Sequence, residues 1–78
     1  MNKQESLAWI DLALESLGRH DLMALIEESL DDFDGEFFKT MDSEVERYAA
    51  QNDQATADRL TEIARTIAAL RQNRTENL

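Results

Sequence analysis

Apolar residues recur along the chain at alternating intervals of three and four, the spacing of one face of an α-helix. Four such stripes follow one another, formed by Leu7, Ile10, Leu14 and Leu17, by Met23, Ile26, Leu30 and Phe33, by Phe38, Met41, Val45 and Tyr48, and by Leu60, Ile63, Ile67 and Leu70. The pattern predicts a small up-down bundle of four helices that share one core. The expected helices span residues 3–17, 22–33, 35–51 and 54–72.

The fold class is predicted to be all-α, with no sheet. The chain has no proline and two glycines, and helix-forming residues outnumber β-branched ones. No stretch shows the alternation between turn signals that is typical of a strand. A chain of 78 residues has room for a single domain, which we assign to residues 1–72. Residues 73–78 lose the apolar period and are expected to fray.

Polar residues at the expected helix joints have the spacing of capping motifs. Asn2 and Glu5 match a capping box at the start of the first helix. Gly18 fits the left-handed position that follows a helix. Asp21 is expected to cap the second helix. Asn52 is expected to end the third helix, and Asp53 to begin the fourth.

The segment SLDDFDGEFF, residues 29–38, sets four carboxylates around one glycine and invites comparison with a calcium-binding loop. In an EF-hand loop the invariant glycine stands at position 6, between the first ligand at position 1 and a bidentate glutamate at position 12. Aligning Gly35 with that glycine puts Leu30 and Met41 at the two ligand positions. The pattern therefore argues against calcium.

A junction between two helices explains the same segment better. With Asp34 as N-cap, Phe33 and Phe38 have the spacing of a hydrophobic staple. Asp34 and Glu36 then lie near the positive end of the helix dipole, which favours negative charge. We therefore predict a helix-to-helix corner closed by phenylalanine.

Negative charge is concentrated in the first two-thirds of the chain. Residues 1–52 contain 4 basic and 13 acidic residues, a balance of −9, whereas residues 53–78 contain 4 of each. Such a surface repels phosphates, which argues against direct binding of DNA or RNA. The candidate acidic surface consists of Glu27, Glu28, Asp31, Asp32, Asp42 and Glu46. It is either a solvated face or a docking surface for a basic partner.

The sequence lacks the residue constellations of an enzyme. His20 is the one histidine and there is no cysteine, so neither a di-iron Glu-x-x-His pair nor a thiolate site can be assembled. No glycine-rich phosphate loop is present. We predict a non-enzymatic protein without metal or cofactor. Because no run of about 20 apolar residues and no signal-peptide layout occur, we expect a cytoplasmic protein that does not enter a membrane.

Trp9 and Leu12 fall outside the apolar stripe of the first expected helix. At about 100° per residue, both lie roughly opposite the stripe that contains Ile10. If that stripe faces the core, Trp9 and Leu12 face outward with Ser16, and the three form a candidate surface for a partner. The alternative is that the helix is sandwiched, or that Trp9 lies across a neighbouring helix at the bundle edge.

Residues 22–70 show a characteristic succession of features. An apolar helix is followed by a Leu-Asp-rich corner ending in Glu-Phe-Phe, a second helix, an Asn-centred turn and a last helix with Ala and Arg-Leu. This span resembles an accessory helical segment of bacterial, cyanobacterial-type proteins that combine tetratricopeptide repeats with caspase-like CHAT domains. Gln51-Asn52 stands where Gly-Asn is expected. The resemblance implies an accessory helical module in a scaffolding context and transfers no catalytic residue.

Two functions remain open at this point. The favoured one is a helical protein–protein interaction module, an adaptor or scaffold that binds another protein or a second copy of itself. The alternative is an acidic decoy or inhibitor whose carboxylates imitate nucleic-acid phosphates and occupy a basic cleft. A decoy predicts steep salt dependence, because screening weakens charge-led association.

Overall fold

The computed structural model describes residues 1–16 and 18–76, including the backbone alone for 73–76. The elements are α1 (Lys3–Glu15), α2 (Arg19–Glu28), the 3₁₀ turn η1 (Leu30–Asp32), α3 (Gly35–Ala50) and α4 (Gln54–Glu76). This part of the chain contains no strand, and the predicted all-α bundle of four helices is confirmed. The helix expected to end at 72 continues to Glu76, so residues 73–76 of the expected frayed tail are helical, and 77–78 lie outside the described residues.

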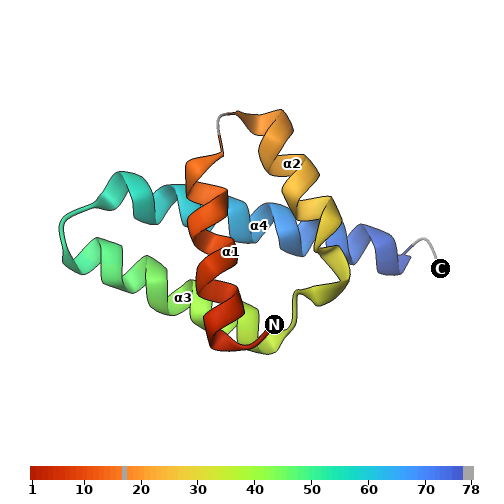
Figure 1. Cartoon of the computed structure of the whole chain (residues 1–78), viewed down its shortest axis with the longest axis horizontal. Coiled ribbons are helices and arrows are strands. Elements are labelled where there is room, and N and C mark those ends of the chain that lie inside the picture. The colour runs from red at the N-terminus through yellow and green to blue at the C-terminus, as the bar shows by residue number, and fades with distance from the viewer. Residues whose placement is uncertain (17, 77–78) are drawn as a thin grey trace.

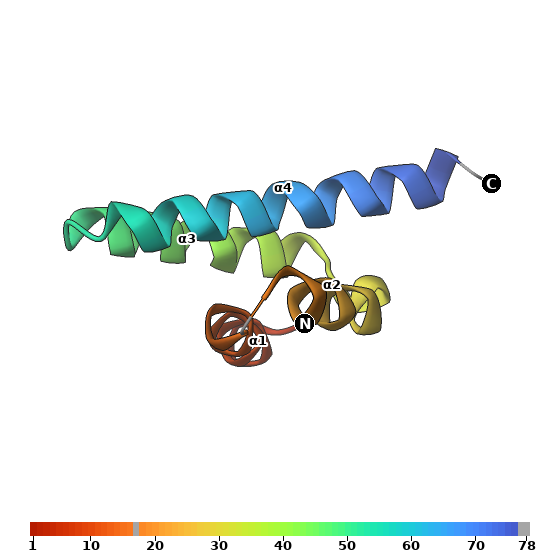
Figure 2. The same cartoon turned by 90° about the horizontal axis from the view of Figure 1, so that it is seen from above.

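The helices form two layers. α3 and α4 run antiparallel and pack along each other, and α1 packs on α3. Figure 2 shows α1 and α2 on one side of the α3/α4 pair, and Figure 1 shows that they run across it rather than alongside, so the four helices do not form the predicted up-down arrangement. The N-terminus lies near the start of α3, so the beginning of α1 meets the corner between α2 and α3 (Figure 1).

The core lies between the two layers. Its buried members are Trp9, Ile10, Ala13, Ile26, Phe33, Phe37, Met41, Leu60, Ile63 and Ile67. The stripe predicted for α4 is buried at three of its four positions, whereas the stripe predicted for α1 is displaced. α1 buries Ser6, Trp9, Ile10 and Ala13, while Leu7 and Leu14 are half-buried and Leu17 lies outside the described residues.

Several helix ends form as the sequence predicts. The Asn2 Oδ1 atom accepts a hydrogen bond from the Glu5 amide at 2.8 Å, and a Glu5 carboxylate oxygen accepts one from the Asn2 amide at 3.1 Å. Asp34 is the N-cap of α3, and its carboxylate accepts a hydrogen bond from the Phe37 amide at 3.0 Å. The ring that packs on Phe33 is that of Phe37, with centroids 4.5 Å apart, one residue before the expected staple partner.

The turn between α3 and α4 closes with a Schellman motif. Asn52 has a φ of 62°, in the left-handed region. The Asp53 amide donates to the Tyr48 carbonyl at 2.9 Å, and the Asn52 amide donates to the Ala49 carbonyl at 3.1 Å. The Asp53 carboxylate then accepts from the Thr56 amide at 3.2 Å. Asn52 therefore ends α3 and Asp53 begins α4, as predicted.

The joint between α1 and α2 differs from the prediction. Gly18 is extended, with a φ of −174°, and it is the N-cap of α2 rather than a left-handed residue after α1. α2 begins at Arg19, so Asp21 lies within its first turn and does not cap it. α1 ends at Glu15, and the Arg59 guanidinium of α4 donates to the Ser16 carbonyl at 3.3 Å.

Candidate partner-binding groove between α1 and η1

Trp9 is buried, and the expectation that it faces outward is wrong. Its side chain is 5% exposed. The indole ring meets Phe33 edge-on at a centroid distance of 5.0 Å and Phe37 at 5.4 Å. α1 is therefore covered on two sides, by α3 and by the corner that leads into α3, and this corresponds to the sandwiched alternative. Ser6 and Ala13, both buried on α1, are small enough for the helix to approach its neighbours closely.

The other two members of the predicted surface separate. Leu12 is 54% exposed and is the one large apolar side chain exposed in the described part of the chain. Ser16 is half-buried, and its hydroxyl donates to the Ala13 carbonyl at 2.6 Å. Of the three predicted residues, Leu12 alone faces solvent, and Ser16 belongs to the end of its own helix.

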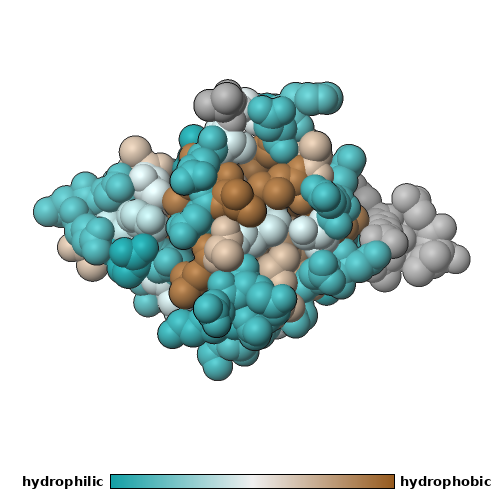
Figure 3. All heavy atoms as spheres, in the orientation of Figure 1, coloured by the Kyte–Doolittle hydropathy of each residue, from teal (hydrophilic) through white to brown (hydrophobic). Residues whose placement is uncertain are grey.

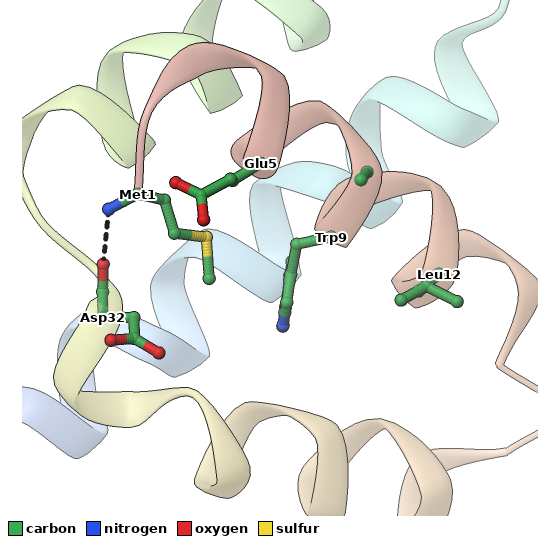
Figure 4. A pocket seen from close by; sticks show the side chains of 6 residues that line it. Met1, Glu5, Trp9, Leu12 and Asp32 are labelled. Atoms are coloured by element: carbon green, nitrogen blue, oxygen red, sulfur yellow. Dashed lines mark hydrogen bonds between the residues drawn. The ribbon is translucent and has the colours of Figure 1, made fainter.

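A groove of about 400 Å³ opens beside Trp9 and Leu12. Its lining residues are Met1, Glu5, Ala8, Trp9, Leu12 and Asp32. Figure 4 shows Glu5, Trp9 and Leu12 on successive turns of α1, with Asp32 facing them across the groove. Because Asp32 is the last residue of η1, the fold brings the corner after α2 up to the first turns of α1.

The Trp9 indole nitrogen has no hydrogen-bond partner. Nε1 is a buried polar side-chain atom left unpaired in the described residues. Figure 4 shows the nitrogen at the end of the ring that projects away from α1, toward α2. A buried tryptophan usually finds an acceptor for this N–H. Leaving a buried donor unpaired costs about 1–3 kcal/mol.

The edge of the groove carries carboxylates and one ammonium group. The Met1 ammonium donates to the Asp32 carbonyl and to the Asp34 carboxylate, both at 3.0 Å. The hydrogen bond from the Phe37 amide, followed by that from the ammonium, lowers the pKa of Asp34. The ammonium is thus engaged at the corner, and the side chains of Glu5 and Asp32 give the groove a negative rim.

The six residues of the predicted acidic surface are all exposed, but they lie on three elements. Glu27 and Glu28 belong to α2, Asp31 and Asp32 to η1, and Asp42 and Glu46 to α3. Asp32 alone among them lines the groove beside Trp9. Asp42 and Glu46 line a different hollow, of about 440 Å³, between α3 and α4. The structure therefore distributes these carboxylates over more than one site.

Groups suited to catalysis or metal binding do not converge in the described residues. No set of three His, Asp or Glu side chains there is placed to hold a metal ion. His20 is exposed in the first turn of α2. Within residues 1–16 and 18–76, no helix combines the length and the apolar character needed to cross a bilayer.

Comparison with known proteins gives no match to a family model, a curated protein or a solved structure. The groove must therefore be interpreted from its own geometry. One sequence signal for the buried face of α1 exists, because Ser6, Trp9 and Ala13 have helical spacing. Their pattern was obscured by the more apolar stripe containing Leu7 and Leu14.

Proposed function

We propose that this chain is a non-enzymatic helical interaction module, an adaptor or scaffold that binds another protein through the groove between α1 and η1. The observation that carries the proposal is the position of Leu12, 54% exposed at the groove beside the buried indole of Trp9. One exposed leucine is ordinary on a protein surface. This leucine differs because it stands beside a hollow, and binding pockets combine an apolar lining with a few placed polar groups, as Trp9 and its unpaired donor provide here.

The surroundings of Leu12 support the same proposal. Figure 3 shows hydrophobic side chains gathered over the space between α1 and α2, within a surface that is otherwise largely polar on this face. A contiguous apolar area with a polar rim is typical of a protein-binding surface. The role also agrees with the accessory, scaffolding context implied by the resemblance of residues 22–70 to segments of bacterial multidomain proteins.

Capture of a partner from a lysate of the source organism tests this function. Three tagged forms are compared at low and at moderate salt: wild type, Leu12→Glu and Ala69→Glu. Ala69 is exposed on α4 and lines neither hollow described above, so Ala69→Glu adds the same charge away from the groove. Trp9→Glu is unsuitable, because a carboxylate in place of the buried ring would unfold the core.

We expect one protein to be retained at moderate salt by wild type and Ala69→Glu and to be lost with Leu12→Glu. The purified partner must reproduce this difference, and circular dichroism must show equal helix content in all three forms. A basic partner that is removed by salt and is indifferent to Leu12 would contradict the proposal and favour the acidic decoy. Failure of wild type to retain any protein that Leu12→Glu loses would also reject it.

A further inference from the structure

In the described part of the chain, the groove lacks a hydrogen-bond acceptor for the N–H of Trp9. Its nitrogen is buried, points toward α2 and meets no acceptor among the described residues (Figure 4). Backbone carbonyls of an incoming peptide are strong acceptors that must themselves be paired when buried. A peptide that reaches Trp9 therefore gives this N–H the acceptor that it lacks in the free protein, in exchange for the peptide carbonyl's hydrogen bond to water.

The apolar part of the groove is suited to a large side chain. Ala8 and Trp9 contribute to its lining and Leu12 stands exposed beside them. Covering Leu12 removes apolar surface from water, which favours an apolar side chain in the occupant. The volume, about 400 Å³, is at the lower end of the range of ligand sites in proteins.

The charge of the groove selects a basic occupant. Glu5 and Asp32 are its charged side chains, and both are acidic. The Met1 ammonium at its edge is already bonded to Asp34. The whole chain carries a net charge of −9, so a second copy brings like charge to an acidic rim. Charge complementarity thus favours a basic segment over self-association.

α2 is the helix that can move so that a ligand reaches the Trp9 N–H. Among its ten residues Ile26 alone is fully buried, while Leu22, Met23 and Leu25 are partly buried against the core. Its N-cap is Gly18, which has no side chain to cap the helix. Because the Trp9 nitrogen is closed off from solvent and points toward α2 (Figure 4), an acceptor reaches it only when neighbouring atoms move aside. Weakly buried elements open at low free-energy cost, so such a movement is accessible.

We propose that the groove between α1 and η1 binds a basic, amphipathic peptide segment of the partner. The segment places an apolar side chain against Leu12, gives a carbonyl acceptor to the Trp9 indole N–H, and sets basic side chains beside Glu5 and Asp32. This inference rests on the proposed interaction function and specifies the chemistry of the partner.

Selection from a random peptide library tests the proposed chemistry of the occupant directly. Twelve-residue peptides displayed on phage are selected in parallel on immobilised wild type, Leu12→Glu and Ala69→Glu. We expect wild type and Ala69→Glu to enrich peptides that combine net positive charge with a large apolar residue. Synthetic copies of these peptides are expected to bind Leu12→Glu at least about tenfold more weakly.

A single-atom change then tests the hydrogen bond. Replacement of Trp9 by β-(3-benzothienyl)alanine puts sulfur where the indole has its N–H and keeps the ring shape. We expect affinity for the selected peptides to fall by about threefold to tenfold, the net effect of one hydrogen bond. Unchanged affinity would remove the Trp9 N–H from the recognition mechanism and overturn the proposal.

Other outcomes separate this inference from the proposed function. Enrichment of acidic or uncharged peptides, or no enrichment, overturns the basic-segment proposal, while a Leu12-dependent partner from the lysate would keep the interaction function. If the selected peptides bind Leu12→Glu as tightly as they bind wild type, recognition lies outside the groove. That result would also overturn the basic-segment proposal. A doubling of mass in sedimentation that Leu12→Glu abolishes would show that the occupant is a second copy.

Discussion

The Trp9 side chain has a ring that is well packed and a nitrogen that is unpaired. Its edge-on contacts with Phe33 and Phe37 are of the kind that add about 0.5–1.5 kcal/mol beyond the burial of area. The buried N–H opposes that gain, because it gave up hydrogen bonds to water and received none in return. Residues that lower the stability of the free protein in this way are often found where a ligand completes the structure.

Removing the N–H alone measures how much the unpaired donor lowers the stability of the free protein. With β-(3-benzothienyl)alanine in place of Trp9, we expect the free energy of unfolding to stay constant or to rise by up to about 1 kcal/mol, because the unsatisfied donor disappears while the ring remains. Urea denaturation followed by circular dichroism gives the comparison. A clear loss of stability would mean that the N–H is satisfied in the free protein, for instance by the face of a neighbouring aromatic ring.

Asp34 gives the protein a predictable response to acid. Hydrogen bonds from the Phe37 amide and then from the Met1 ammonium lower its pKa below the ordinary value of 3.8. A group with a lowered pKa contributes stability above its ordinary value and loses it as the pH falls through the folded value. Asp34→Asn keeps a capping side chain and removes the charge. We therefore expect the difference in melting temperature between wild type and Asp34→Asn to shrink as the pH falls.

Thermal unfolding at pH values from about 7 to about 2.5 checks this expectation. Asp42→Asn, an exposed change elsewhere on α3, is the control for loss of one negative charge. If the two variants differ from wild type in the same way at every pH, the hydrogen bonds at Asp34 do not contribute to acid stability.

At the level of the helices, the ends that were predicted correctly depend on neighbours in sequence. The Asn2–Glu5 box, the Asp34 cap and the Asn52–Asp53 turn each join groups within five residues of one another. Such motifs form from local geometry, so spacing alone reveals them.

The end of α1 was predicted wrongly because its partner is distant in sequence. The Arg59 guanidinium donates to the Ala13 carbonyl at 3.5 Å and to the Ser16 carbonyl at 3.3 Å. A cation that reaches the last carbonyls replaces the glycine that would otherwise end the helix in a left-handed turn. Gly18 is then the N-cap of α2 instead of the residue that ends α1, and no local sequence pattern predicts this.

Arg59→Met tests the tie between α4 and the end of α1. We expect the free energy of unfolding to fall by about 1 kcal/mol, because the carbonyls at that end lose their cationic donor. Arg65→Met is the matched control, since Arg65 forms an ion pair with Glu62 at 3.5 Å with both side chains largely exposed, and we expect at most about 0.5 kcal/mol there. Equal losses in the two variants, measured in urea, would contradict the role given to Arg59.

The candidate groove could be predicted from the sequence only in part. The outward position of Leu12 followed from helical periodicity. The burial of Trp9 did not, because it depends on the rings of Phe33 and Phe37, which arrive from a corner more than twenty residues away. Periodicity ranks the faces of a helix by hydrophobicity, but it gives no account of a helix covered on two sides.

For the molecule as a whole, the two layers differ in how firmly they are held. α3 and α4 pack along their length, and their turn is closed by the Schellman motif. α1 is fixed by its buried face and by Arg59. α2 buries Ile26 alone. The expected order of local stability therefore places α2 last among these helices.

Native-state hydrogen exchange tests this order. We expect the amides of α2 to exchange faster than those of α3 and of residues 54–72, because α2 has one fully buried residue and its other core contacts are only partly buried. A ligand that bonds to the Trp9 N–H would slow exchange in α2, because that nitrogen points toward α2 (Figure 4). If the amides of α2 in the free protein exchange as slowly as those of α3, α2 does not open easily. That result would contradict the movement of α2 on which ligand entry depends.

The most direct measurement follows the Trp9 indole N–H by NMR in a ¹⁵N-labelled chain during titration with a selected peptide or a captured partner. The chain has one tryptophan, so this resonance is unambiguous. We predict that the resonance shifts toward that of a hydrogen-bonded indole and that its exchange with solvent slows as the groove fills. A ligand that binds tightly and leaves the indole resonance unmoved would show that the groove between α1 and η1 is not the binding site.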